Sequence, residues 1–157
     1  MLEKKNSENF NKVRDRTEQE LLVRKSEFLK ICKILDDLKI EYFLQTGILL
    51  GAVRNNDLIP WDWDIEISVF SEKFSPHIDE VANSLKKNDF KIKNIVRQIK
   101  HIKIDFVGEY PENVTGYTIF GWNYSKIKDH YWRKEFVVPS KFLNKFSQIT
   151  FLGRKFN

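Results

Sequence analysis

The sequence predicts an α+β domain of mixed α/β organisation, in which a mixed sheet is flanked by helices. Helical and strand patterns follow one another in the order α-β-α-β-α-β-β-β. The chain has 157 residues, a length that suits one domain with a core of its own. Hydrophobic residues make up 41% and charged residues 31% of the chain, which excludes a disordered tail and a membrane bundle.

The first half of the pattern begins with a polar lead-in over residues 1–16, followed by a long amphipathic helix. Thr17 and Glu20 have the spacing of a capping box. Apolar residues then recur at helical spacing up to about residue 39, namely Leu21, Leu22, Phe28, Ile31, Leu35 and Leu38. A short strand over residues 40–44 and a short helix over residues 48–54, opened by Gly47, come next.

The second half of the pattern is richer in strands. Residues 62–70 alternate polar and apolar side chains as a strand does. Ser75 and Pro76 predict a helix that runs to about residue 87, with Ser75 as its N-cap and Pro76 at its first position. Residues 90–97 and 101–107 predict a β-hairpin, and two further strands are expected at residues 117–122 and 148–152.

Charge and cysteine content narrow the possible ligands, metal sites and cellular location of the protein. Lys and Arg number 27 against 22 Asp and Glu, an excess that suits phosphate-bearing ligands, nucleic acid or an anionic membrane surface without selecting one. Cys32 is the single cysteine, so no internal disulfide forms and a Cys/His zinc site is not expected. No apolar stretch is long enough to span a membrane, and the first residues lack a signal peptide core. We expect a cytoplasmic protein without a transmembrane segment, compatible with peripheral membrane contact.

The clearest chemical signal is the acidic strand. Asp62, Asp64 and Glu66 occupy alternate positions, which places them on one face at steps of about 7 Å. Close carboxylates repel one another, whereas Mg²⁺ or Mn²⁺ would bind them and leave positions for phosphate oxygens. An edge strand with solvated acids is the alternative, but Trp61, Trp63 and the following isoleucines predict a strand packed on at least one face.

Three residues outside this strand are candidates for the same site. Gly47 at a helix start allows backbone N–H groups to approach a phosphate, although a turn glycine needs no ligand. Arg54 could bind a phosphate with two N–H groups, or simply complement the C-terminus of its helix. Asp105 is the sole acid of its strand and would add a third carboxylate.

The aromatic and basic segment over residues 122–134 is a candidate for contact with a sugar or nucleotide. Aromatic faces stack on bases and sugars, and Lys126 and Arg133 could bind phosphates. A surface and partial core role is the alternative for this segment.

Together these residues resemble a known family. A glycine-opened helix, a strand with alternating acids and a later acid-bearing strand resemble the nucleotidyltransferase fold of the polymerase-β-like superfamily. The more specific strings Thr46-Gly47-x-Leu49-Leu50-Gly51-Ala52-Val53-Arg54 and Ile59-Pro60-Trp61-Asp62-x-Asp64 look like the LicD family, which includes phosphocholine transferases and fukutin-related ribitol-phosphate transferases. The resemblance implies one nucleotidyltransferase-like domain over residues 17–157. Because the family pattern continues into a C-terminal helix, the resemblance leads us to expect a domain that is C-terminally short.

The resemblance also implies a reaction. A phospho-alcohol, phosphocholine or a polyol phosphate, would pass from a CDP-linked nucleotide donor to a hydroxyl of a glycan or lipid-linked saccharide, in the synthesis of cell-surface polysaccharide or lipopolysaccharide. If the roles of the family motif apply to this chain, the catalytic residues would be Asp62, Asp64 and Asp105. The metal ligands would be Asp62, Asp64, Glu66 and Asp105. Gly47 and Arg54 would contact the donor phosphates. Asp105 could instead be the base that takes the proton of the acceptor. Two departures from the family pattern stand near the site, Ile48 in place of a small hydroxyl residue and Glu66 in place of Asp.

Three other functions are compatible with parts of the sequence. An adenylyltransferase acting on a small molecule would share the fold, but the Ile59-Pro60-Trp61-Asp62 string argues against it. A non-catalytic nucleotide-binding module would explain the departures at Ile48 and Glu66. A nucleic-acid binder is not expected, because the basic residues are spread along the chain and the acidic strand would repel phosphates.

Overall fold

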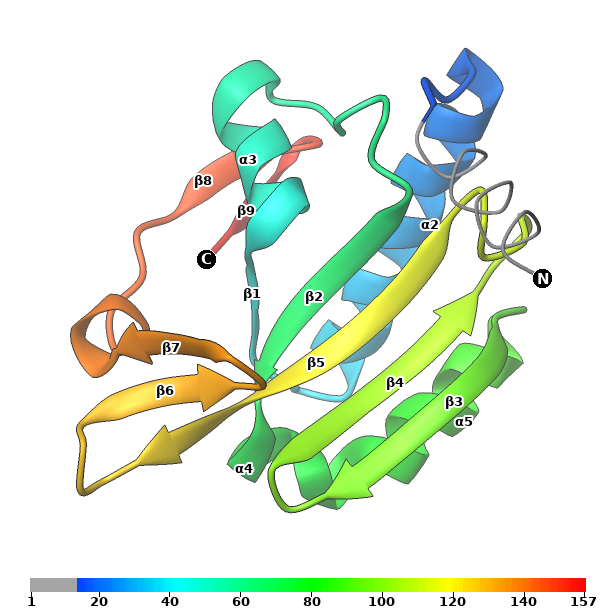
Figure 1. The fold of residues 1–157 in the computed structure, drawn as a ribbon. Coiled ribbons are helices and arrows are strands. Elements are labelled where there is room, and N and C mark those ends of the chain that lie inside the picture. The colour runs from blue at the N-terminus through cyan, green and yellow to red at the C-terminus, as the bar shows by residue number, and fades with distance from the viewer. Residues whose placement is uncertain (1–13) are drawn as a thin grey trace, which may run out of the picture.

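The computed structural model describes residues 14–157, so most of the expected lead-in lies outside the described residues. Its main sheet contains the strands β1 (Tyr42–Leu44), β2 (Asp64–Phe70), β3 (Lys91–Gln98), β4 (His101–Val107) and β5 (Gly116–Ser125). They lie in the order β1-β2-β5-β4-β3 (Figure 1). β2 and β5 are parallel, whereas the other neighbours are antiparallel. The predicted α+β class with a mixed sheet is therefore confirmed.

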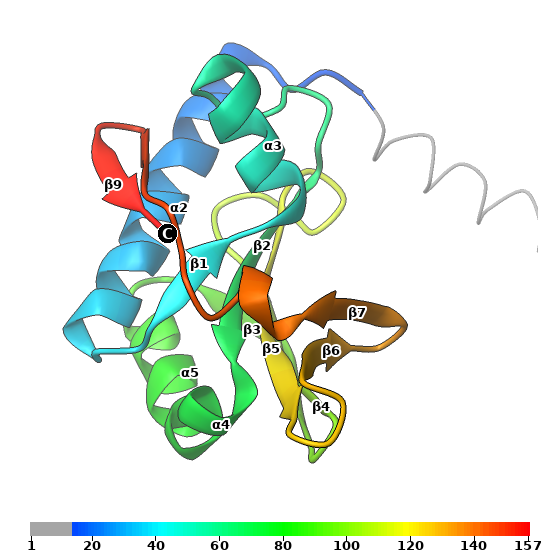
Figure 2. The same cartoon turned by 90° about the vertical axis from the view of Figure 1, so that its left-hand side faces the viewer.

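Helices cover one face of this sheet and leave the other open. The helical elements are α2 (Glu18–Asp37), α3 (Thr46–Asn55), α4 (Ser71–Phe74), the 3-10 turn η1 (Ser75–His77) and α5 (Ile78–Lys87). Figure 2 shows α2 and α5 on the same side of the sheet. The capping box of α2 is confirmed, because Glu20 N donates to Thr17 Oγ1 and Thr17 N donates to Glu20 Oε2. Within residues 14–157, no helix has both the length and the apolar character needed to cross a membrane.

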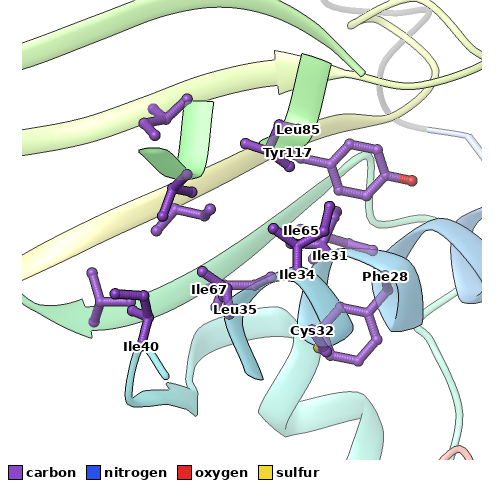
Figure 3. Packing of buried hydrophobic residues seen from close by; sticks show 14 of the residues in the cluster. Phe28, Ile31, Cys32, Ile34, Leu35, Ile40, Ile65, Ile67, Leu85 and Tyr117 are labelled. Atoms are coloured by element: carbon purple, nitrogen blue, oxygen red, sulfur yellow. The ribbon is translucent and has the colours of Figure 1, made fainter. Parts of the chain in front are cut away.

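The core lies between α2, α5 and the covered face of the sheet. Phe28, Ile31 and Leu35 of α2 are fully buried against the isoleucines of β2 (Figure 3). Cys32 lies among them, and burial raises the pKa of its thiol to about 12. This thiol therefore stays protonated and acts as a small core residue. Since successive strand residues point to opposite faces, burying Ile65 and Ile67 directs their acidic neighbours to the open face.

The C-terminal part adds two hairpins to this framework. β6 (His130–Arg133) pairs with the distal end of β5, and β7 (Phe136–Pro139) pairs with β6. After the 3-10 turn η2 (Ser140–Phe142), β8 (Ile149–Phe151) and β9 (Arg154–Phe156) form a separate hairpin. The ring of Phe28 in α2 lies 6.0 Å from that of Phe151 and 5.6 Å from that of Phe156. The last hairpin therefore extends the core.

The structure corrects three details of the sequence prediction. Helical structure begins at Ser71, directly after β2, and Ser75 caps no helix. Pro76 lies in η1, because a residue without an N–H is tolerated in a short 3-10 turn between two helices. β2 begins at Asp64 rather than at residue 62. The strand predicted at residues 148–152 exists as β8 but pairs only with β9, and β6, β7 and β9 were not predicted.

Candidate active site

The acidic side chains lie on the open face of the sheet at the start of β2. Asp64 and Glu66 alternate with Ile65 and Ile67, which are 2% and 1% exposed. Burial and the neighbouring carboxylates of Asp62 and Glu66 raise the pKa of Asp64 to about 7. A stable fold gains nothing from gathering these acids, so their proximity marks this edge of β2 as a candidate site.

The N-terminus of α3 lies against the first of these acids. A Cβ atom at position 47 would overlap the Asp62 carboxylate, so any larger residue there would displace that carboxylate. Thr46, the first residue of α3, has a φ of 55°, a left-handed conformation that is strained for a β-branched residue. The free N–H groups at this helix end favour an anion beside them. Gly47 therefore brings backbone donors and a carboxylate to one place.

Two buried arginines hold the segment that carries Asp62. Arg24 of α2 is 1% exposed and donates to the carbonyl oxygens of Asp62 and Asp64. Arg16 is 4% exposed and donates to the carbonyl oxygens of Trp61 and Val114 at 3.1 Å each. The last residue of the expected lead-in is thus part of the packed structure. Both arginines fix the backbone from which the acids project.

The Glu66 carboxylate forms an ion pair with an arginine of β6. Arg133 Nη2 lies 2.8 Å from Glu66 Oε2, and Arg133 is 4% exposed. Its guanidinium carbon lies 4.5 Å from the ring centre of Phe120 and 5.1 Å from that of Trp122. Its Nη1 atom is buried and has no hydrogen-bond partner in the protein. The structure therefore brings Arg133, a predicted substrate contact, next to the acids.

Asp105 faces the same side of the sheet two strands away. The register aligns Glu66 with Thr118 and Thr118 with Asp105, so Glu66 and Asp105 lie about 10 Å apart along the backbone row. Thr118 Oγ1 donates to Asp105 Oδ1 at 3.0 Å, and Lys103 Nζ lies 2.6 Å from Asp105 Oδ2. Both carboxylate oxygens of Asp105 therefore have partners.

Two cavities meet at the acidic row. The helix-side cavity has a volume of about 340 Å³ and lies between the start of α3, Asp62 and Arg133. The sheet-side cavity has a volume of about 280 Å³ and lies over Asp105, Lys103 and Thr118. Asp64 and Glu66 line both cavities. Groups bound in the two cavities would therefore meet at these two carboxylates.

The structure does not bring all predicted site residues together. Arg54 is exposed in the last turn of α3, about 10 Å along the helix from Gly47, and lines neither cavity. Lys126 lies in the turn between β5 and β6, away from the acids. Within residues 14–157, no three His, Cys, Asp or Glu side chains are close enough together to form a ready metal site. Glu66 and Asp105 instead pair with Arg133 and Lys103.

The tryptophans next to the acids also differ from expectation. Trp61 is 51% exposed, although it was expected to pack against the strand face. Strand alternation would place Trp63 on the face opposite to the acids, but Trp63 lines the sheet-side cavity together with Asp64. The reason is that both precede the first residue of β2, so strand alternation does not apply to them.

Comparison with known proteins places this site in a family. A family model described as LicD/FKTN/FKRP, nucleotidyltransferase domain, matches residues 39–157. The chain belongs to this family. The matched region contains every predicted site residue and both cavities, and the resemblance proposed from the sequence strings is confirmed.

Curated relatives of this LicD-family chain match over short stretches. It is 41% identical to Ribitol 5-phosphate transferase FKRP of mouse and of human over 39 residues, which is 25% of this chain. It is 32% identical over 62 residues, or 40% of this chain, to an uncharacterized protein of Rickettsia typhi. The match spans only 8% of the FKRP proteins and 20% of the Rickettsia protein.

Several residues of this LicD-family site were missed from the sequence, namely Arg16, Arg24, Lys103 and Thr118. Arg24 carried a usable signal, because it lies three residues after Leu21 and four before Phe28 on the apolar face of α2. A charged residue at such a position needs buried partners. Thr118 carried no signal, since its role depends on the pairing of β5 with β4.

Proposed function

We propose that this domain transfers a phospho-alcohol from a CDP-activated donor to a hydroxyl of a saccharide acceptor, with Mg²⁺ as cofactor. The diphosphate bond of the donor breaks, a phosphodiester to the saccharide forms, and CMP leaves. Membership of the LicD family supports a transferase. The observation that carries the proposal is the pair of cavities that share Asp64 and Glu66, with a helix N-terminus and a buried arginine on one side and Asp105 on the other. A two-substrate transfer needs such a shared boundary.

The residues present fit a magnesium ion. Mg²⁺ binds through one or two carboxylates and takes its remaining oxygens from water and phosphates, so Asp62 and Asp64 suffice without a third acid. Burial and repulsion from the Asp62 carboxylate raise the pKa of Asp64, and a cation would relieve the repulsion. When bound, the ion would neutralise charge on the transferred phosphoryl group. Glu66 would then orient Arg133 rather than bind the metal directly.

The helix-side cavity fits the diphosphate of the donor. The N–H groups at the start of α3 would favour an anion beside them, and the lack of a side chain at Gly47 would let a phosphate approach the backbone. Arg133 adds a fixed guanidinium, since Glu66 and the rings of Phe120 and Trp122 hold it in place. We therefore assign donor phosphate binding to Gly47 and Arg133. Arg54, at the other end of α3, could contact the donor only if the donor extended along the helix.

The sheet-side cavity fits the acceptor. Asp105 lines this cavity at the level of Glu66 in the strand register. This position favours a place beside the reacting phosphoryl group over direct coordination of an ion held by Asp62 and Asp64. We assign Asp105 the role of receiving the proton of the attacking hydroxyl at its carboxylate. Thr118 and Lys103 would orient that carboxylate, and Lys103 would balance its charge.

A ligand screen tests this proposal. Thermal unfolding would be followed with CDP-choline, CDP-ribitol, CMP or ATP, each with Mg²⁺ or with EDTA. A ligand present at about 100 times its Kd stabilises the fold by about 2.7 kcal/mol, so a CDP-linked compound should raise the Tm only when Mg²⁺ is present.

Matched variants sharpen the screen. Arg133→Lys should lose the stabilisation by CDP compounds, because lysine offers neither the planar fork nor the stacking surface. Arg97→Lys, an exposed arginine paired with Asp79, should keep it. Stabilisation by ATP in place of CDP compounds would make the domain an adenylyltransferase. Nucleotide binding without any transfer to saccharide would make it a binding module.

A further inference from the structure

Two isoleucines occupy the tips of neighbouring hairpins. Ile99 lies in the turn between β3 and β4 and is 92% exposed, and Ile127 lies in the turn between β5 and β6 and is 98% exposed. Turns favour Gly, Pro, Asn, Asp and Ser, whereas a fully exposed β-branched residue contributes nothing to the folding of a turn. These are the two most exposed large apolar residues that the structure describes, and their place on neighbouring turns makes that surface a candidate for contact with something apolar.

Both tips lie at the same end of the molecule. Figures 1 and 2 show the β3–β4 and β5–β6 turns both in the lower part of the molecule, with α3 in the upper part. Asn123 of β5 donates to the carbonyl oxygen of Lys100 at 3.3 Å, which ties one hairpin to the other. A hollow of about 550 Å³ between them is lined by Ile99, Tyr124 and Trp132 among others. We call these two turns and the hollow the hairpin-tip surface.

Lysines flank both isoleucines. Lys100 follows Ile99, and Lys126 and Lys128 stand on either side of Ile127. Two acids lie close by, Glu72 at the hollow and Asp129 in the second turn, where Asp129 accepts a hydrogen bond from Tyr124. The balance at the tips is therefore positive. The Tyr124 and Trp132 side chains, each apolar with one polar end, suit the boundary between water and lipid.

We propose that the hairpin-tip surface docks the domain on a bilayer that contains anionic lipids. Ile99 and Ile127 would enter the boundary between head groups and acyl chains, and the three lysines would stay among the lipid phosphates. A flat bilayer can receive two separate tips at once. Charge complementarity favours anionic lipid over a second copy of this chain, because two copies would bring like-charged lysines together.

This orientation sets the distance between the acidic row and the bilayer. Thr118, beside Asp105, lies seven residues along β5 from Ser125, which corresponds to about 23 Å at about 3.3 Å per residue. The acids would stand above the bilayer by about that distance. A saccharide carried on a lipid could span this gap with its sugars, whereas a bare lipid head group could not.

Vesicle sedimentation tests the docking without substrate, metal or nucleotide, so its outcome is separate from that of the proposed transfer. The protein would be mixed with phosphatidylcholine vesicles with and without phosphatidylglycerol at physiological ionic strength. We expect sedimentation with the anionic vesicles only. The Ile99→Glu/Ile127→Glu variant should bind at least about tenfold more weakly, since two apolar anchors become charged. Leu22→Glu, a 59% exposed leucine on α2, should bind like the parent protein.

A second variant separates the lysines from the isoleucines. Lys100→Gln/Lys126→Gln/Lys128→Gln should weaken binding by about fivefold for each lysine that meets the leaflet, and binding should lose its salt dependence. Circular dichroism would confirm that each variant is folded. The proposal is overturned if the folded parent protein ignores anionic vesicles, or if the double glutamate variant binds as well as the parent. It is also overturned if the tips instead mediate a concentration-dependent dimer that the glutamates abolish.

Discussion

Replacing Asp64 by asparagine in the metal-free protein should stabilise the fold at neutral pH. The folded protein raises the pKa of Asp64 from its ordinary 3.8 to about 7 through burial and the carboxylates of Asp62 and Glu66. The folded state therefore holds the Asp64 proton more tightly than the unfolded chain does. Stability from this group is complete below about pH 4 and is lost as pH rises to about 7.

The size of this effect follows from the difference of about three pH units. At 1.36 kcal/mol per unit the loss is about 4 kcal/mol, and the remaining solvent contact of the side chain reduces it to about 2–4 kcal/mol. Asp64→Asn should then raise the Tm at pH 8 by about 4–16 °C and leave it unchanged near pH 4. Asp89→Asn, at an exposed position outside the site, serves as the matched control.

Thermal unfolding in EDTA from pH 4 to pH 8 measures the difference in Tm between the variant and the parent protein. A second series with Mg²⁺ measures how the cation changes each Tm. Mg²⁺ should stabilise the parent protein at pH 8 and leave Asp64→Asn largely unaffected, because the variant lacks a ligand. A variant that is less stable than the parent at pH 8, with an unchanged response to Mg²⁺, would refute the reasoning. The acids would then support the fold rather than bind a cation.

Three further substitutions test other parts of the site. Gly47→Ala should displace the Asp62 carboxylate and lower Mg²⁺-dependent nucleotide affinity by about 10²-fold in calorimetry; unchanged affinity would remove α3 from the site. Arg24→Met should cost about 2–3 kcal/mol in urea unfolding, because the carbonyl oxygens of Asp62 and Asp64 lose a buried charged donor; a neutral result would show that water replaces it. Asp105→Asn should slow transfer by about 10²–10⁴-fold while nucleotide binding survives; a parallel fall in affinity would make Asp105 a metal ligand.

Local sequence signals predicted the elements that local interactions determine. The capping box at Thr17 and the periodic apolar residues that follow it lie within one helix, so α2 could be located closely. The alternation in residues 64–67 likewise predicted which side chains of β2 are buried. Pairing between distant segments was less predictable. Nothing in residues 149–151 shows that they pair with β9 rather than with the main sheet.

The candidate site shows the same division. Asp62, Asp64 and Asp105 could be proposed as site residues from the chain, because acids among apolar residues stand out in the sequence. Their partners could not, since Arg24 and Lys103 reach these acids only through packing and strand register. Sequence patterns thus indicated the charged groups of the site but not which groups contact one another.

Lys126 and Arg133 show why sequence proximity failed to predict a shared role. Both belong to one basic and aromatic segment and were expected to contact the same substrate. Lys126 lies in the turn after β5, whereas β6 reverses direction and carries Arg133 back along β5 to Glu66. One hairpin therefore delivers an arginine to the acidic row and leaves a lysine at the opposite end of the domain, beside Ile127. If the hairpin-tip surface docks on lipid, the same β5–β6 hairpin couples the membrane contact to the position of Arg133, and vesicle binding should then change the affinity for the donor.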